Sequence, residues 1–228
     1  MKGLLLQYDD RSPTWATKLI ERNKIAACNL EYDHIYLNKC EFDETIPPYW
    51  RKVFLVEKYL KSGYNIVVWI DSDAVLVNEA EFQKCIDIEM KDFSMAFSSN
   101  PGILRKEAWP FRLWAAPFCA GVFIVKNTES SLDILKDWKN SFDPILWSKS
   151  KVGKWEAIGT YGGESYEQGS FEIHIFRSAK HRKNLLQFKH TRLNYLPIKG
   201  ESCKADTIFL HYWNGNRMRI LRDWENVF

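Results

Sequence analysis

The sequence predicts an α/β fold with a mainly parallel sheet, and three observations support this prediction. Short apolar segments bounded by polar residues alternate with longer segments in which apolar residues recur at helical spacing. The alternation continues along the chain without a linker, a repeat or a low-complexity tract, as expected of consecutive βαβ units. The length of 228 residues is sufficient for one substantial core. We therefore expect residues 1–228 to form a single domain.

The predicted strands are short apolar runs that end in polar residues. The first is GLLLQY, which is followed by two aspartates, and the most apolar is IVVWI, which leads into Asp71-Ser72-Asp73. A later segment, LLQFKHTRLNYLPI at 185–198, is also expected to be extended. The predicted strands cover residues 3–8, 28–38, 66–70, 94–99, 118–127 and 207–213.

Helices are predicted between these strands. Pro13 suits the first turn of a helix, and the segment 47–63 begins with two prolines and ends at a glycine, which are common helix start and stop signals. Thr128 or Ser130 can cap a further helix through a side-chain oxygen. The predicted helices follow Pro13 and cover 47–63, 128–142 and 166–176, and a glycine-rich loop covers 159–165.

The charge balance excludes some classes of partner. The chain has 32 basic and 29 acidic residues in mixed order and a net charge of +3, so we expect no binding to nucleic acid or to a membrane surface. The basic cluster KHRK at 180–183 is expected to be a solvated surface. Five cysteines without a CxxC pair predict neither a disulfide framework nor a structural zinc site. Because no segment resembles a signal peptide or a membrane span, we expect a soluble cytoplasmic protein.

Two carboxylates, Asp71 and Asp73, follow the most apolar predicted strand. Placing both at the edge of a sheet would cost several kcal/mol in repulsion and desolvation unless a cation were present. Residues two apart in an extended chain point to the same side, so the pair can bind one divalent cation, or one carboxylate can bind a ligand hydroxyl. In the alternative interpretation, one aspartate caps the following turn and the other is solvated.

His211 follows another apolar run, TIFL, and is a candidate third ligand. Ligands of α/β sheets bind beyond the carboxyl ends of the strands, and Asp71, Asp73, Gly121 and His211 all lie at or near predicted strand ends. An imidazole combined with two carboxylates suits Mn²⁺ better than Ca²⁺, and Mg²⁺ is the second choice.

These motifs resemble a known family. An apolar strand that runs into Asp-x-Asp, with a histidine near the end of the last strand, resembles the GT-A glycosyltransferases, in which a DxD motif holds Mn²⁺ against a nucleotide-sugar diphosphate. The stretch YWRKVFLVEKYLKSGYNIVVWIDSDAVLVN is similar to the galactosyl, mannosyl and xylosyl transferases of the GMA12/MNN10 type (GT34), and WIDSDA is its most specific block. The segments CAGVFIVKNTESSLDILKDW, YEQGSF and HYWNGNR resemble further blocks of that family.

The resemblance implies a GT-A fold, with a Rossmann-like mixed sheet, and a role for each matching residue. Asp73 and His211 would bind the metal, and Asp71 would bind the metal or the ribose. Arg217 would neutralise the leaving diphosphate. Gln7 and Tyr8 would contact the base, and Lys52 would contact the nucleotide or its phosphates. Ser72 and Gly121 are small residues that would permit close approach of the ligand. Gln168, with Glu167 beside it, would lie near the anomeric carbon.

The resemblance further implies a nucleotide-sugar donor, with UDP favoured over GDP, a glycan or glycoprotein acceptor, and retention of the anomeric configuration. Glu164 or Glu167 could instead serve as the base of an inverting enzyme. Trp109, Phe111 or Trp114 could stack on an acceptor sugar, although such rings could equally belong to the core. A mobile flap could be formed by Tyr161, Gly162 and Gly163. A compact chain of this kind also resembles the cytosolic glycosyltransferases of large algal viruses, which build capsid glycans in the host.

Two other functions are compatible with parts of the sequence. WIDSDAV matches the DxDx[TV] pattern of aspartyl-phosphate phosphatases, in which Asp71 would be the nucleophile and Asp73 the acid/base. That class requires a second acidic pair after a later strand, whereas Asp133 and Asp137 lie in a predicted amphipathic helix. A non-catalytic Ca²⁺-dependent sugar-binding module is the second alternative. Such modules are usually β-sandwiches, and the α/β pattern argues against one.

Overall fold

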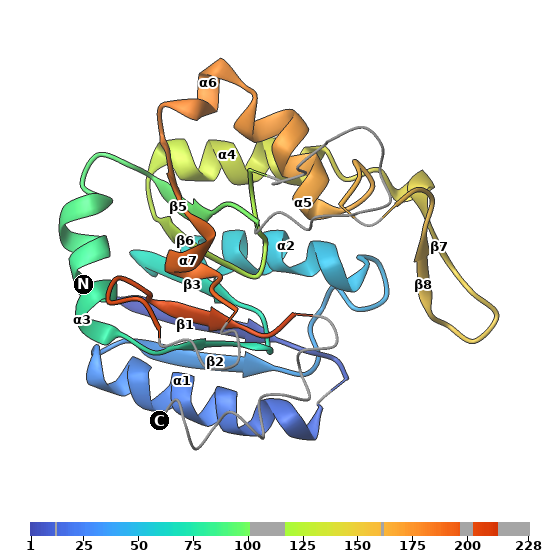
Figure 1. The fold of residues 1–228 in the computed structure, drawn as a ribbon. Helices are drawn as coiled ribbons and strands as arrows, with labels where there is room; N and C mark the ends of the chain where they lie inside the picture. The colour runs from blue at the N-terminus through green and yellow to red at the C-terminus, as the bar shows by residue number, and fades with distance from the viewer. Residues whose placement is uncertain (12, 101–116, 161, 197–202, 214–228) are drawn as a thin grey trace, which may run out of the picture.

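Six strands form the main sheet in the part of the chain that the computed structural model describes, which is residues 1–228 without 12, 101–116, 161, 197–202 and 214–228. Their order across the sheet is β2-β1-β3-β6-β5-β9 (Figure 1). Every residue of β1, β3 and β5 is buried, which explains why these strands are continuous apolar runs. The strands are β1 (Gly3–Tyr8), β2 (Asp33–Leu37), β3 (Ile66–Ile70), β5 (Met95–Ser98), β6 (Val122–Lys126) and β9 (Leu185–Phe188).

The sheet is mixed, because one strand runs against the others. β1 pairs in parallel with both β2 and β3, and β5 pairs in parallel with β9, whereas β6 is antiparallel to both of its neighbours. The register sets Trp69 opposite Phe123 and Ile70 opposite Val122. The start of β6 therefore lies beside the carboxyl end of β3. The prediction of a mainly parallel α/β sheet is confirmed.

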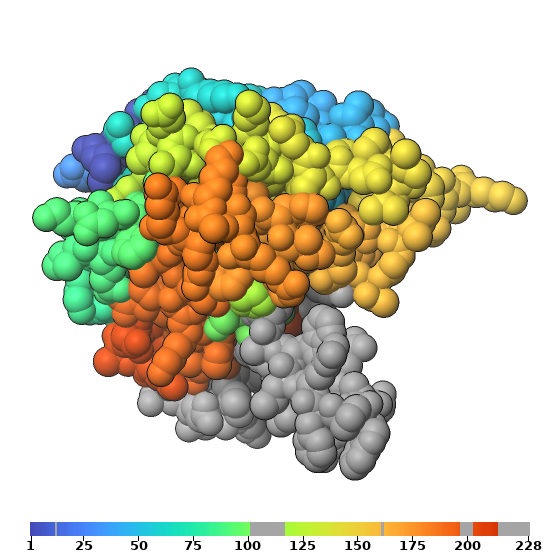
Figure 2. All heavy atoms as spheres, turned by 90° about the horizontal axis from the view of Figure 1, so that it is seen from above, coloured from blue at the N-terminus to red at the C-terminus, as the bar shows by residue number. Residues whose placement is uncertain are grey.

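In the described part of the chain, two small antiparallel pairs lie outside the main sheet. β4 (Ala74–Leu76) pairs with β10 (Phe209–His211), and His211 is opposite Ala74. The segment 207–213 thus contains the predicted strand, but this strand does not join the main sheet. β7 (Trp147–Lys149) and β8 (Trp155–Ala157) form a hairpin that projects from the body of the molecule (Figures 1 and 2).

The helices begin where the predicted signals occur. Pro48 is the first residue of α2, and Thr128 caps α4 by accepting from the Ser131 N–H, while the Ser131 side chain accepts from the Thr128 N–H. The α-helices are α1 (Thr17–Asn29), α2 (Pro48–Lys61), α3 (Glu79–Lys84), α4 (Glu129–Asn140), α5 (Glu167–Ser170), α6 (Ala179–Arg182) and α7 (His190–Leu193). Other helical segments differ from the α-helix in the width of their turns. The narrower 3₁₀ segments are η1 (Thr14–Ala16) and η3 (Pro144–Leu146), and the wider π segments are η2 (Cys85–Glu89) and η4 (Phe171–Phe176).

Helices cover both faces of the main sheet, as Figure 1 shows for α1 on one side and for α2 and α4 on the other. Alternate residues of β1 point to the two sides, so Leu4 and Leu6 pack in the core beneath α2 and α4, and Leu5 packs beneath α1. Trp50 and Trp138 are fully buried in the first of these cores. These two tryptophans are therefore part of the core packing.

Three predicted boundaries differ from the structure. Residues 28 and 29 complete α1 and the strand begins only at Asp33, because a helix and a strand follow each other closely there. The segment 185–198 is not extended throughout, since α7 interrupts it. The strand predicted over 118–127 begins at Val122, and the residues before it form a loop at the edge of the sheet. No helix of the described residues is both long and apolar enough for a membrane crossing.

Candidate active site

Asp71, Ser72 and Asp73 form the turn that connects β3 to β4. The Ala74 N–H donates to the carbonyl oxygen of Asp71 at 2.9 Å, which closes the turn. The prediction that the two aspartates share a side because the chain is extended is therefore wrong. They come together because the chain turns into β4, whose pairing with β10 places Asp73 beside His211.

Asp71, Asp73 and His211 form a compact cluster of candidate metal ligands. One ligand atom of each lies within 4.8 Å of the others, as the sequence led us to expect. His211 Nε2 is 3.1 Å from Asp73 Oδ1, and both side chains are almost fully buried. Burial alone would lower the pKa of His211, but the carboxylate of Asp73 outweighs it and raises this pKa to about 10. Two carboxylates and one imidazole fit Mn²⁺, or Mg²⁺ as the second choice.

The ring of His211 packs directly on the backbone of Gly121. A Cβ atom added to Gly121 would lie 2.0 Å from His211 Cε1 and 2.5 Å from Nδ1, so no other residue fits without displacing the ring. Gly121 reaches this edge because β6 is antiparallel, which its sequence did not indicate. The Asp71 N–H donates to the Gly121 carbonyl oxygen at 2.8 Å and joins the two loops.

We predict that Gly121→Ala weakens metal binding. The added methyl group would push the His211 ring away from Asp73, and loss of one well-placed ligand contact should lower Mn²⁺ affinity by about 10 to 100-fold. Titration of the protein with Mn²⁺, followed by the electron paramagnetic resonance signal of the free ion, measures this change. Gly153→Ala on the projecting hairpin is the control for a strained glycine substitution away from the site, because its φ of +75° disfavours alanine although nothing lies within 4 Å of its Cβ position. Equal affinity in Gly121→Ala and the unmodified protein would contradict the prediction.

Two donors fix one oxygen of Asp71. The Trp69 indole N–H donates to Asp71 Oδ1 at 2.7 Å, and Lys52 Nζ donates to the same atom at 3.0 Å. Trp69 lies two residues earlier on β3, so its side chain extends to the same side of the strand as the start of the turn. The Asp71 side chain is 31% exposed, which leaves its other oxygen available to a ligand.

Lys52 connects Asp71 with the short helix α5. Its ammonium group is 3.0 Å from Asp71 Oδ1, 3.0 Å from the Ala120 carbonyl oxygen and 3.4 Å from Glu167 Oε1. Burial lowers the pKa of Lys52, but Asp71 and Glu167 more than compensate and hold it above its usual value. An ammonium group has three N–H donors, so these contacts occupy all of them. The predicted contact of Lys52 with the nucleotide or its phosphates remains a prediction.

Glu167 and Gln168 lie on α5, next to Lys52. Burial raises the pKa of Glu167, with Lys52 acting against the rise, and Glu167 Oε2 has no hydrogen-bond partner within the described part of the chain. Gln168 Oε1 accepts from the Ala120 N–H at 3.1 Å. The predicted pair thus lies beside the Asp71 network, and Ala120 bonds Gln168 directly and reaches Glu167 through Lys52.

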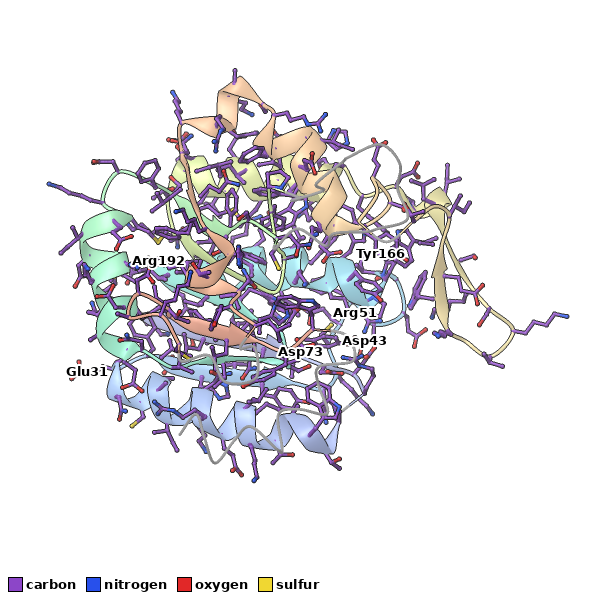
Figure 3. All side chains as sticks on the ribbon, viewed as in Figure 1. Glu31, Asp43, Arg51, Asp73, Tyr166 and Arg192 are labelled. Carbon is purple, nitrogen blue, oxygen red and sulfur yellow. The ribbon has the colours of Figure 1, made fainter. Side chains whose placement is uncertain are left out.

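The end of β1 also reaches this edge. Gln7 is fully buried, with its Nε2 at 3.5 Å from the Asp71 carbonyl oxygen and its Oε1 at 2.9 Å from His34 Nε2. The Tyr8 hydroxyl donates to Asp43 Oδ1 at 2.7 Å and accepts from the guanidinium of Arg51. Figure 3 shows Asp43 next to Arg51, in agreement with the 3.1 Å between Arg51 Nη1 and Asp43 Oδ1. Gln7 and Tyr8 are therefore engaged in protein contacts, and their contact with a base stays a prediction.

Sequence reasoning missed one buried carboxylate at this edge. Asp9 is 3% exposed and accepts a hydrogen bond from the Ser72 hydroxyl. The Arg11 guanidinium donates from Nε to Asp9 Oδ1 at 2.9 Å and from Nη2 to Asp9 Oδ2 at 2.7 Å. Burial opposes its ionisation, but the hydrogen bonds from Arg11 and Ser72 hold the pKa of Asp9 below its usual value. Its position directly after the first strand was the available signal. Ser72 thus joins the turn to the end of β1.

Some predicted residues lie outside the described residues, namely Arg217, the aromatic residues Trp109, Phe111 and Trp114, and Tyr161 of the proposed flap. Asp133 and Asp137 lie on α4, where both bind Lys180, at 2.7 and 2.8 Å, and Asp137 also binds His181. They do not supply the second acidic pair that a phosphatase site with Asp71 would require.

Comparison with solved structures identifies the fold. The structure of a glycosyltransferase involved in the glycosylation of the major capsid of PBCV-1 aligns over 99% of this chain and 100% of that chain, with a TM-score of 0.67 and 14% sequence identity. The chain has a GT-A glycosyltransferase fold. Mouse xyloside xylosyltransferase 1 aligns over 95% of this chain and 99% of that chain, with a TM-score of 0.54 and 11% identity. The expectation of a GT-A fold is confirmed.

Curated proteins with similar sequences are plant glycosyltransferases. Glycosyltransferase 6 of Arabidopsis thaliana is 23% identical over 211 residues, which cover 90% of this chain and 43% of the relative. Xyloglucan 6-xylosyltransferase 4 of the same plant is 27% identical over 119 residues, which cover 51% of this chain and 22% of the relative. This chain thus spans less than half the length of these relatives. No protein-family model matches it.

Proposed function

We propose that this chain is a metal-dependent glycosyltransferase that moves a sugar from a nucleotide-diphosphate sugar to a glycan. The observation that carries the proposal is the cluster of Asp71, Asp73 and His211, whose ligand atoms lie within 4.8 Å of one another at the carboxyl edge of a GT-A sheet. The similarity to plant glycosyltransferases supports the reaction class. Asp71, Asp73 and His211 would hold the cation, which would supply positive charge to the leaving diphosphate.

The chain's own residues would orient the donor. Trp69 and Lys52 fix one oxygen of Asp71, and the 31% exposure of this side chain makes the other oxygen available to the ligand. Gln168 Oε1 accepts from the Ala120 N–H. The Gln168 amide nitrogen has no hydrogen-bond partner among the described residues, and it would form a hydrogen bond to the sugar of the nucleotide sugar. Glu167 would keep Lys52 in place and contribute negative charge near the developing oxocarbenium ion. In this arrangement Lys52 positions Asp71.

The donor that we propose is a UDP-sugar with a pentose, hexose or deoxyhexose, and the reaction retains the anomeric configuration. The resemblance of WIDSDA and its flanking segments to galactosyl, mannosyl and xylosyl transferases supports this choice. The proposed acceptor is a glycan or a glycoprotein. This class includes the xyloglucan named for the plant relatives and the capsid glycans named for the aligned structure, and a viral capsid or surface glycan is the acceptor we favour.

A thermal-shift screen of nucleotide sugars with and without Mn²⁺ tests the proposal. A ligand present at 100 times its dissociation constant stabilises a protein by about 2.7 kcal/mol, which raises the melting temperature by several degrees. We expect such a rise for UDP-sugars only when Mn²⁺ is present. Slow Mn²⁺-dependent hydrolysis of the same nucleotide sugar would distinguish an enzyme from a sugar-binding module. The absence of any shift or turnover with UDP-, GDP- and other nucleotide sugars would overturn the proposal.

A further inference from the structure

The ring of His211 is held by different partners on its two nitrogens. Nε2 lies 3.1 Å from Asp73 Oδ1, on the side of the candidate metal ligands. Nδ1 lies 3.1 Å from Asn194 Oδ1 on the other side. Cys119 Sγ is 4.0 Å from Nδ1, at the limit of a weak contact to sulfur. Asn194 is therefore the main partner of the nitrogen that does not face the metal site.

We propose that Asn194 is a positioning residue that sets the tautomer and orientation of His211 for binding a divalent cation. The inference rests on the proposed metal site and adds a residue to it. An amide oxygen can only accept a hydrogen bond, so Nδ1 of His211 must carry the proton when it binds Asn194 Oδ1. Nε2, whose proton is held by the Asp73 carboxylate, is then the nitrogen that gives up its proton when a cation binds. A ligand histidine whose second nitrogen is bound in this way binds metal about 10 to 100-fold more tightly than one that has lost this partner.

The local fold holds Asn194 in place. It follows α7, and its backbone N–H donates to the His190 carbonyl oxygen at 2.9 Å. The next residue, Tyr195, accepts from the His211 N–H at 2.9 Å, so the backbone of the asparagine segment is bonded directly to the strand that contains the histidine. The distance between the amide oxygen and the ring is thus set by backbone hydrogen bonds.

The burial of Asn194 is costly, which argues against a purely structural role. Its side chain is fully buried, and among the described residues its Nδ2 has no hydrogen-bond partner. A buried amide donor without a partner is unfavourable for folding, and an apolar residue of similar size would avoid that penalty. Asn194→Leu removes this unpaired Nδ2 but leaves the buried Nδ1–H of His211 without its acceptor, so metal affinity separates the two roles. A structural role predicts unchanged metal affinity, whereas a positioning role predicts weaker metal binding that Asn194→Asp restores.

The test measures Mn²⁺ binding and stability in the whole chain, without any sugar. We expect Asn194→Leu to bind Mn²⁺ about 10 to 100-fold more weakly under conditions in which the variant is fully folded. Asn194→Asp keeps an acceptor for Nδ1–H and should bind Mn²⁺ within about threefold of the unmodified protein, because carboxylates are among the usual partners of a ligand histidine.

Two controls separate the possible outcomes. Cys119→Ala removes the weaker neighbour of Nδ1 and should change Mn²⁺ affinity less than threefold. Asn127→Ala removes an asparagine that donates to the Leu60 and Tyr64 carbonyl oxygens at the other end of β6, and it should lower stability without changing Mn²⁺ affinity. Unchanged affinity in Asn194→Leu, or equal loss in Asn194→Leu and Asn194→Asp, would overturn the inference while leaving the proposed function intact. Failure of the unmodified protein to bind Mn²⁺ would overturn both.

Discussion

Asp73→Asn is expected to reduce the rate of Mn²⁺-dependent sugar transfer by about 10³-fold, the upper end of the effect of removing one charge-stabilising group. Asparagine has the shape of aspartate but not its charge, and the carboxylate of Asp73 is 3% exposed beside His211. The substitution therefore removes a metal ligand without opening a cavity. Initial rates with the nucleotide sugar and acceptor identified by the screen, measured at saturating donor, report the loss.

The fold should survive this change. The backbone of Asp73 is held by the Tyr212 N–H, which donates to its carbonyl oxygen at 2.8 Å, and this bond does not involve the side chain. Asp87→Asn is the matched control, because Asp87 is exposed and its side chain binds Gln83 at 2.8 Å, away from the candidate metal ligands. A variant Asp73→Asn that retained full Mn²⁺-dependent activity would show that Asp73 is not a metal ligand.

The sequence was sufficient to predict which residues meet at the candidate metal site. Asp71, Asp73 and His211 each follow a strongly apolar run, and the ends of such runs gather at one edge of an α/β sheet. The pattern did not reveal how they meet. β4 has three residues and, within the described residues, pairs only with β10, and such short segments leave almost no periodic signal.

The direction of β6 was also hidden from the sequence. An apolar run has the same composition in a parallel and an antiparallel strand, because both faces are buried in either case. The direction decides that Gly121 lies at the start of the strand and packs on His211. The hydrogen bonds of Trp69, Asp9 and Asn194 were missed for a related reason, since each depends on side chains that come together only in three dimensions.

The second large effect is expected from Lys52→Met, which should lower the free energy of unfolding by about 3 to 5 kcal/mol near neutral pH, as when one partner of a buried ion pair is removed. Lys52 is 5% exposed, and Glu167 beside it is 2% exposed. Methionine fills a similar volume but leaves the Glu167 carboxylate without a cation. The double variant Lys52→Met with Glu167→Gln should recover most of this loss, because no unpaired buried charge then remains. Denaturant unfolding of the two single variants and the double variant measures the coupling.

The pH dependence of Lys52→Met follows from Glu167. Burial already raises the pKa of Glu167 above its ordinary value of 4.5, and loss of Lys52 would raise it further. A raised carboxyl pKa means that the folded state holds its proton more tightly than the unfolded state, so stability is greatest at low pH and falls as the pH rises through the pKa of the folded state. The loss of stability caused by Lys52→Met should therefore shrink toward pH 4.5 and grow toward neutral pH.

Lys58→Met, on the same helix but 47% exposed, should change stability by less than about 1 kcal/mol at every pH. A deficit of equal size across this range would mean that lost packing, and not the unpaired carboxylate of Glu167, accounts for the effect.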